Sequence, residues 1–382
     1  MRDRAIRQRP DLHRRDFLRL GAGAASAALG SAALPIFAGH AFAAEPASAE
    51  ALVEAARKEK FLNTIALAPD WANYANIIQR FEKKYGLDVR SASPEATSAQ
   101  ELQAVRSLKR QERAPDVLDL GQPFALAGAR DGLLAPYKVA TWETIPSDMK
   151  DATGLWYADY FGIVSFGVNL SAVKVAPKSW SDLKKPEFRG MIALNGSPLG
   201  AGAAFAGVFA AALANGGSLD DIAPGVSFFA ELAASGNFTP VAATPASLTS
   251  GQTPIVINWD YLNLAQTKKS SGLTDVTTII PNDAAPFGNY YCQALSAFAP
   301  HPSAARLWME FIYSDEGQLL FLEGFAHPVR FADLMSRSVI PEALLAQMPS
   351  AEAYKSVRFP TIKQTTGAQK ILAAEWARQV RT

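Results

Sequence analysis

The pattern of apolar and polar positions predicts alternating strands and helices along the first part of the chain. Residues 61–67 form a short apolar run typical of a buried strand. Apolar positions then recur at helical spacing over residues 77–85, until Gly86 ends the pattern. Residues 87–91 and 117–120 predict the next two strands. Alternation of this kind is typical of a parallel α/β sheet.

Helix ends in this pattern carry recognisable capping residues. Ser98 followed by Glu101 has the form of a capping box that begins a helix extending to about Gln111. Near the end of the chain, an apolar helical face follows residue 302, and Ser314 is a plausible cap for a further helix ending near Gly324.

A second α/β unit is predicted in the middle of the chain. A strand-like run at 191–194 precedes an alanine-rich helix over 201–215, and another strand follows at 254–258. Aromatic and β-branched segments at 160–169 and 290–298 bracket this unit. They suggest a chain that crosses from one unit to the other and returns.

Composition narrows the class of protein. With 382 residues, 49% of them apolar, the chain is long enough for about two domains with a buried core. The 37 basic and 36 acidic residues nearly balance, and no basic block lies beyond the first twenty positions, so nucleic acid is not an expected partner. Cys292, the single cysteine, excludes an internal disulfide or a thiolate metal cluster.

The N-terminal segment predicts export. Basic residues before position 20 are followed by an uncharged stretch over residues 20–44 that ends in small residues. Residues 13–19 resemble a twin-arginine signal, with Arg14 and Arg15 as the pair. An N-terminal membrane anchor is the alternative, but the stretch is rich in Gly and Ala and poorly suited to a bilayer. We expect residues 1–43 to be a signal peptide cleaved near Ala43, the twin-arginine translocase to be a partner, and the mature chain to be periplasmic.

Five short runs of the chain carry a family resemblance. They are APDV at 114–117, GLLAPY at 132–137, SWSDL at 179–183 with PEFRG at 186–190, APHPSAA at 299–305 and SDEGQ at 314–318. In this order they resemble the periplasmic solute-binding proteins of ABC importers, in the branch grouped with iron and polyamine binders. The resemblance implies delivery of a small-molecule solute to an ABC transporter permease in the inner membrane.

The same resemblance implies an α/β fold of the type II periplasmic binding protein class, with two lobes, two crossover strands and an interlobe cleft. One lobe would comprise residues 44–163 and 293–340, and the other residues 164–292 and 341–382. Solute bridging the lobes would favour their closure about a hinge.

Loops beyond the carboxyl ends of the strands are where such a fold binds its ligand. Candidate ligand-binding residues at these loops and at the returning connector are Trp71, Asn73, Tyr74, Gln122, Ser197, Gly200, Trp259, Asp260, Tyr261 and Tyr291. Asp260 lies between two aromatic residues, an arrangement suited to an organic cation such as a polyamine. Ferric iron is an alternative, although its usual Tyr-Tyr pair appears here as Asp260-Tyr261. A helix start near Ser197 would instead suit an organic anion or phosphonate.

Each candidate also has a structural explanation. The Trp residues can be core residues, Asp260 can cap a helix, Tyr291 can pack the hinge, and Ser197 with Gly200 can form a turn. His301, before a proline at a helix start, is expected to be structural. An exported hydrolase or redox enzyme is the rival class, but the nucleophile, zinc and dinucleotide motifs are missing from the sequence. We therefore expect a binding protein without a cofactor or catalytic activity, in transport or in sensing.

Overall fold

Three β-α steps make up the first part of the structure, as the apolar pattern predicts. A computed structural model describes residues 48–349, 354 and 356–381, so the predicted signal peptide with Arg14 and Arg15 lies outside the described residues. The elements are α1 (Ala49–Glu59), β1 (Phe61–Ile65), α2 (Tyr74–Tyr85), β2 (Asp88–Ala92), α3 (Ser98–Leu108), β3 (Val117–Gly121), α4 (Gln122–Arg130) and β4 (Leu134–Ala135). β1 and β2 pair in parallel.

The second α/β unit and the C-terminal helices follow. The middle of the chain contains β5 (Tyr157–Asn169), β6 (Ile192–Leu194), α5 (Gly202–Ala214), α6 (Ala223–Ser235), α7 (Pro245–Thr249), β7 (Ile255–Trp259), α8 (Asp260–Ser270), β8 (Val276–Ile279) and β9 (Gly288–Ser296). The last part contains α9 (Pro302–Ile312), α10 (Asp315–Glu323), β10 (His327–Pro328), α11 (Phe331–Ser336), α12 (Glu342–Gln347) and α14 (Ile362–Gln379). Ser314 caps α10 by accepting from the backbone N–H of Gly317, as predicted.

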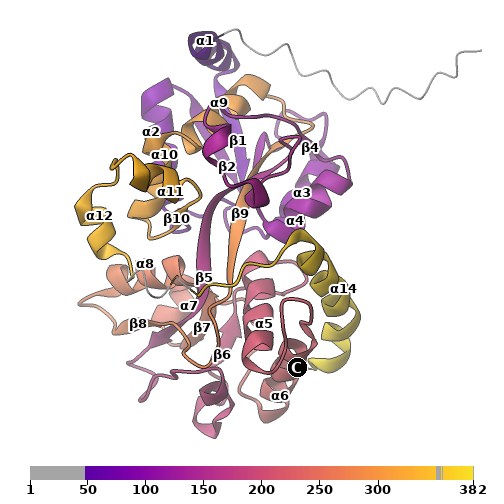
Figure 1. Ribbon diagram of the computed structural model, residues 1–382, viewed down its shortest axis with the longest axis vertical. Helices are drawn as coiled ribbons and strands as arrows, with labels where there is room; N and C mark the ends of the chain where they lie inside the picture. The colour runs from indigo at the N-terminus through magenta and orange to yellow at the C-terminus, as the bar shows by residue number, and fades with distance from the viewer. Residues whose placement is uncertain (1–47, 350–353, 355, 382) are drawn as a thin grey trace, which may run out of the picture. The chain divides into compact units, whose positions relative to one another are not determined.

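Two long strands join the two units. β5 pairs with β9 through residues 157–163 and then with β7 and β8 through residues 164–169. β9 in turn pairs with β3 through residues 291–295. Figure 1 shows β5 and β9 running between the elements around β1 and those around β6 and β7. The aromatic connectors expected from the sequence are therefore the crossover strands.

The larger sheet is mixed rather than parallel. Its strand order is β3-β9-β5-β7-β6, and β6 and β7 are parallel to one another. β5 and β9 run antiparallel to each other, and β5 runs antiparallel to β7, because they carry the chain across and back. The expectation of a parallel sheet holds only within each unit.

Helix α3 begins one residue away from the predicted capping box. Thr97 is the N-cap: its hydroxyl accepts from the backbone N–H of Gln100, and its own backbone N–H donates to the Gln100 side chain. Ser98 Oγ instead accepts from the backbone N–H of Gly121 at 3.1 Å. Glu101 is buried and accepts from the backbone N–H of Asp119 at 3.0 Å. These two side chains fasten α3 to the end of β3.

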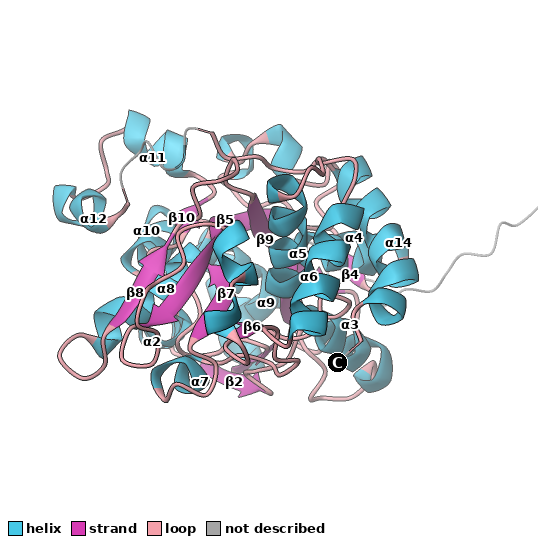
Figure 2. Cartoon of the chain, turned by 90° about the horizontal axis from the view of Figure 1, so that it is seen from below, coloured by secondary structure: helices cyan, strands magenta, loops and turns pink. Residues whose placement is uncertain are grey.

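The C-terminal helix α14 packs on elements from both parts of the chain. Trp376 contacts the rings of Phe229 and Phe238 near α6. Thr365 donates to the Gln122 side chain at the start of α4. Figure 2 shows α14 beside α6 and α4.

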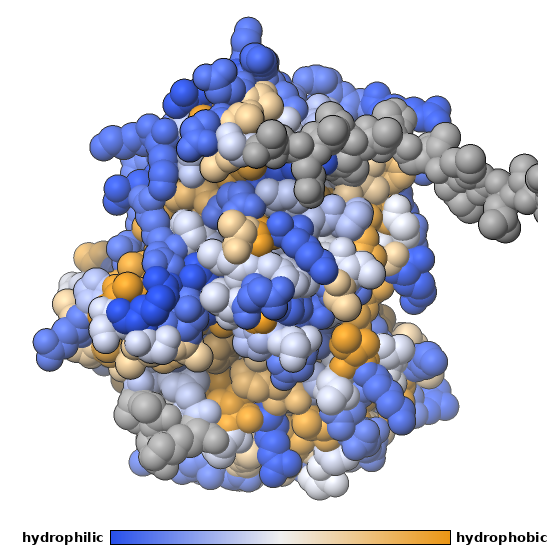
Figure 3. All heavy atoms as spheres, turned by 45° about the horizontal axis from the view of Figure 1, so that its top comes forward, coloured by the Kyte–Doolittle hydropathy of each residue, from blue (hydrophilic) through white to orange (hydrophobic). Residues whose placement is uncertain are grey.

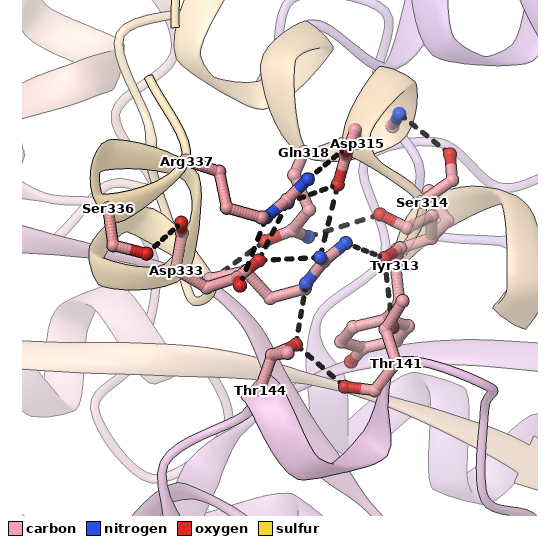
Figure 4. Close-up of polar contacts among 12 residues, drawn as sticks. Thr141, Thr144, Tyr313, Ser314, Asp315, Gln318, Asp333, Ser336 and Arg337 are labelled. Carbon is pink, nitrogen blue, oxygen red and sulfur yellow. Dashed lines mark hydrogen bonds and ion pairs between the residues drawn. The ribbon is translucent and has the colours of Figure 1, made fainter. Parts of the chain in front are cut away.

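A buried arginine network holds α11 against α10. The Arg330 guanidinium, 3% exposed, bonds to Asp333 at 2.6 Å and to Thr144 at 2.7 Å. Arg337 forms two 2.7 Å bonds to Asp315, which also contacts Arg330 (Figure 4). Because both arginines are neutralised by these carboxylates, the network is an unsuitable anion site and serves packing.

The surface is mostly polar. Figure 3 shows hydrophilic residues over most of one face, with apolar residues gathered toward its lower part. Large apolar side chains that are exposed include Leu273, at 87%, and Val175, at 67%. Among the described residues, no helix combines the length and apolar character required to cross a bilayer.

Candidate functional site

Five aromatic side chains meet where the crossover strands pass the ends of β1 and β7. Trp71 follows β1, Tyr160 and Tyr291 lie in β5 and β9, and Trp259 and Tyr261 lie at the junction of β7 and α8. Tyr160 stacks on Tyr291 at 5.6 Å between ring centroids, and Trp71 meets Tyr291 edge-on at 5.3 Å. Trp259 stacks on Tyr261 at 6.4 Å. We call these five residues the aromatic cluster.

Four members of the aromatic cluster were predicted as candidate ligand contacts, and Tyr160 was not. Tyr160 is the first residue of the segment interpreted only as a connector. Its ring contacts Tyr261 at 5.5 Å as well as Tyr291. The signal that could have identified it is the pairing of the two aromatic connectors, which places their side chains next to one another.

A hydrogen-bonded chain leads from the aromatic cluster to a buried carboxylate. The Trp71 indole N–H donates to the Tyr160 hydroxyl at 2.7 Å, and that hydroxyl donates to Asp119 Oδ2 at 2.8 Å. Asp119, in β3, is 4% exposed. Its other oxygen, Oδ1, is buried and forms no hydrogen bond with the described residues, although the Tyr74 hydroxyl lies near this carboxylate.

Two further acids lie near Asp119. Asp159 accepts from the Gln293 side chain at 3.0 Å, and Glu101 accepts from the backbone N–H of Asp119. Burial raises the pKa of Asp119 to about 7 and the pKa values of Asp159 and Glu101 well above their ordinary range. In the described part of the chain, none of the three forms a salt bridge with Lys or Arg. The region beside the aromatic cluster therefore favours a positive charge.

Asp260, the carboxylate singled out from the sequence, has both oxygens occupied. Oδ1 accepts from the backbone N–H of Ile163 at 2.9 Å, and Oδ2 accepts from the Tyr354 hydroxyl at 2.6 Å. Burial raises its pKa to about 6. Asp260 is the first residue of α8 and lines a cavity of about 310 Å³ together with residues of α8, β8 and 347–349.

Asn73 and Tyr74, at the start of α2, lie beside the site and bond to other elements. Asn73 has a positive φ of 72°, and its side chain donates to the carbonyl of Leu320 at 2.7 Å. The Tyr74 hydroxyl accepts from Gln293 at 2.8 Å and lies 3.5 Å from Asp159. Both side chains help to hold the loop that carries Trp71.

Of the remaining candidates, Gln122 lies where α4 meets α14, whereas Ser197 and Gly200 lie in the loop before α5. Gln122 donates to the Tyr290 hydroxyl at 2.7 Å and accepts from Thr365 at 2.7 Å. Ser197 is exposed, and its hydroxyl accepts from the backbone N–H of Leu199 at 3.3 Å. The carbonyl of Gly200 accepts from the backbone N–H of Ala99 at 3.3 Å.

The N-terminus of α5 faces the aromatic cluster. Its N-cap residue, Ala201, offers no side-chain hydrogen bond. The hydroxyl of Tyr291 lies against the first helical turn, near Gly202 and the backbone N–H of Ala203. Within the described ranges, no group of three or more His, Cys, Asp or Glu side chains is arranged to hold a metal ion.

Comparison with known families gives one match. Residues 112–356 match the model of a family described as bacterial extracellular solute-binding protein. Comparison with curated protein sequences finds no match.

Solved structures share the fold at low sequence identity. The periplasmic binding protein AfuA from Actinobacillus pleuropneumoniae, with exogenous fructose-6-phosphate bound, aligns with a TM-score of 0.67 at 18% identity. A putative spermidine/putrescine ABC transporter protein from Listeria monocytogenes aligns with a TM-score of 0.63 at 12% identity. Iron-bound HitA from Pseudomonas aeruginosa aligns with a TM-score of 0.59 at 20% identity. Each alignment covers 84% of this chain and 99% of the other. The fold is thus the two-lobed one of periplasmic binding proteins.

Proposed function

Since this chain belongs to the bacterial extracellular solute-binding proteins, we propose that the solute it captures is a small organic cation, of which a polyamine is one example. Proteins of this family are the solute-binding components of ABC transporters. They act with a membrane permease and are not enzymes, and membership implies a periplasmic location.

The observation that carries the proposal is the unpartnered Oδ1 of Asp119 beside the aromatic cluster. Ring faces attract an ammonium group, and a buried carboxylate supplies a charge-assisted hydrogen bond. A buried charge is stabilised strongly only when it is paired. A cation bound at Asp119 would therefore offset the free-energy cost of burying this carboxylate in the unliganded protein. Asp119 takes the role that the sequence suggested for Asp260.

Other ligand classes fit these residues less well. An anion such as a sugar phosphate or phosphonate would lie near three buried carboxylates without a neutralising Lys or Arg. Ferric iron would require phenolates, whereas burial raises the pKa values of Tyr160, Tyr261 and Tyr291. The solved relatives described as binding fructose-6-phosphate or iron therefore do not guide the choice here.

Capture would proceed by closure of the two lobes about the crossover strands. β5 changes partner from β9 to β7 between Ile163 and Val164, which supports a lobe boundary at residue 163. The rings of the aromatic cluster contact one another, so a guest can enter only if the lobes separate. Contacts that the guest makes with both lobes would then favour the closed state.

Thermal unfolding with a panel of amines, phosphonates, carboxylates and ferric citrate tests the proposal. We expect an amine to raise the melting temperature by several degrees at saturation, since ligand binds only the folded state. Asp119→Asn should abolish the shift, whereas the matched variant Asp260→Asn should retain it. A shift produced only by phosphonates, carboxylates or iron would contradict the assignment of a cation.

Export through the twin-arginine translocase is proposed for residues 1–43. The Arg14-Arg15 pair and the small residues up to Ala43 support it. Replacing both arginines with Lys should retain the chain in the cytoplasm, and N-terminal sequencing of the periplasmic protein should begin at Ala44. Periplasmic recovery of the double variant in unchanged yield would refute this route.

A further inference from the structure

The aromatic cluster contains two hydrogen-bond donors without acceptors among the described residues. They are the indole N–H of Trp259, which lies near the Tyr291 hydroxyl without forming a hydrogen bond to it, and the hydroxyl of Tyr261. Trp259 is 2% exposed and Tyr261 is 1% exposed, so bulk solvent does not reach them. Buried polar groups in folded proteins are nearly always paired, and an unpaired donor costs stability. Both donors therefore point to a missing hydrogen-bond acceptor.

A simple amine cannot provide that acceptor. An indole N–H only donates, and a protonated amine also only donates. A diamine could pair with Asp119 Oδ1 but would leave the Trp259 N–H without a partner. A guest that satisfies the whole site needs a cationic donor for Asp119 and a separate acceptor for Trp259 and Tyr261.

The surroundings of Trp259 favour an anionic acceptor. Its ring lies 6.3 Å from that of Tyr291, whose hydroxyl lies against the first turn of α5. That turn has no side-chain cap, and helix N-termini stabilise negative charge. The three acids lie in α3, β3 and β5, whereas the two donors lie in β7 and α8. Asp260, which lies between the two donors in the chain, has both of its oxygens occupied by Ile163 and Tyr354.

We propose that the guest is a small zwitterion, an amino acid with its ammonium group at Asp119 and its carboxylate at Trp259 and Tyr261. This inference rests on the proposed function, because it keeps the cation at Asp119 and adds the second group.

Isothermal titration with matched compounds tests the inference on the purified protein. The panel contains unbranched compounds of two to six carbons: amino acids, diamines, amino alcohols, monoamines and carboxylic acids. Comparing compounds of equal length separates the contribution of the ammonium group from that of the carboxylate. We expect the best amino acid to bind at least about tenfold more tightly than the diamine, amino alcohol or monoamine of equal length, the tenfold corresponding to one charge-assisted hydrogen bond.

A nearly isosteric variant checks the donor side. Tyr261→Phe removes only the hydroxyl, so it should weaken the amino acid about tenfold and leave the monoamine unchanged. Tyr290→Phe is the matched control, because that hydroxyl bonds to Gln122 outside the aromatic cluster. Equal weakening of amino acid and monoamine by Tyr261→Phe would overturn the carboxylate assignment.

Failures of the two proposals are distinguishable. If a diamine or amino alcohol binds as tightly as the amino acid, the zwitterion is wrong while the organic cation stands. If no amine-bearing compound binds, but carboxylic acids or ferric citrate do, both proposals are wrong.

Discussion

The charge of Asp119 determines how one part of the protein's stability depends on pH. Burial raises its pKa from 3.8 to about 7 in the folded protein. Between these two pH values, the folded state holds a proton that the unfolded state has released. The stability that this proton provides is therefore complete below about pH 4 and is lost as the pH rises through 7.

Replacing this carboxylate should stabilise the unliganded protein in alkaline solution. Asp119→Asn retains an acceptor for Tyr160 but carries no charge, so we expect its melting temperature at pH 8 to exceed that of the wild type by roughly 5 °C. At pH 4 the difference should vanish. Melting curves across this range provide the test, and a pH-independent difference would show that the charge of Asp119 is not the cause.

His301 should give a pH dependence of its own. Its ring nitrogens lie 2.8 Å from Asp116 and 3.0 Å from Glu112. Burial lowers the pKa of His301, but the two carboxylates together raise it by more, so the net shift of the pKa is upward. The stabilisation is therefore complete below pH 6.5 and is lost as the pH rises through the higher, folded-state pKa.

The corresponding variant is His301→Gln. Its free energy of unfolding should fall by roughly 2 kcal/mol at pH 5.5, as for a hydrogen bond to a charged group, and by less at pH 8.5. Urea unfolding at both pH values measures the two losses. An equal loss would mean that His301 acts only through packing.

The two aspartates show what single residues reveal before a structure is known. Asp260 attracts notice because it lies between two aromatic residues in the sequence, but its oxygens bond to Ile163 and Tyr354, both distant along the chain. Asp119 lies in an apolar strand and resembles a core position. Its importance depends on Tyr160 and on an unpartnered oxygen, which are consequences of tertiary packing.

Among the secondary-structure elements, α3 has an N-terminal cap whose contribution to the free energy of unfolding can be measured directly. Thr97→Ala removes a side-chain acceptor for the backbone N–H of Gln100 and should lower the free energy of unfolding by about 1 kcal/mol. Ser107→Ala, at an exposed position of the same helix, should change it by less than about 0.5 kcal/mol. Urea unfolding distinguishes them, and similar values for both variants would argue against the cap.

The same helix shows why element ends are harder to predict than elements. Thr97 with Gln100 and Ser98 with Glu101 both fit the capping-box spacing, so the sequence alone cannot choose between them. Tertiary contacts decide, because Ser98 and Glu101 bond to β3. Apolar periodicity predicted β1, β2, β3, β6, β7, α2, α5 and α9. It contains no information on strand direction, so it did not predict the mixed sheet.

At the scale of the whole molecule, two glycines form a close contact across the site. A Cβ on Gly202 would lie 3.2 Å from the Cα of Gly121 and 3.1 Å from the Tyr291 hydroxyl. Nearby, the carbonyl of Gly200 accepts from the backbone N–H of Ala99. The end of β3 and the start of α5 thus meet with no side chain between them. Under the proposed lobe boundaries, Gly121 and Gly202 belong to different lobes, so this contact forms when the lobes close.

A side chain at this contact should hinder closure. Gly202→Val places a bulky group against Gly121 and Tyr291, so we expect solute affinity to fall at least about tenfold. Saturating solute should reduce the radius of gyration of the wild type in small-angle X-ray scattering and reduce that of the variant less. Gly200→Ala is the control, because its Cβ would meet Ala99 at an ordinary 3.8 Å. If the wild type does not become more compact with solute, or if Gly202→Val binds normally, the lobes do not close at this contact.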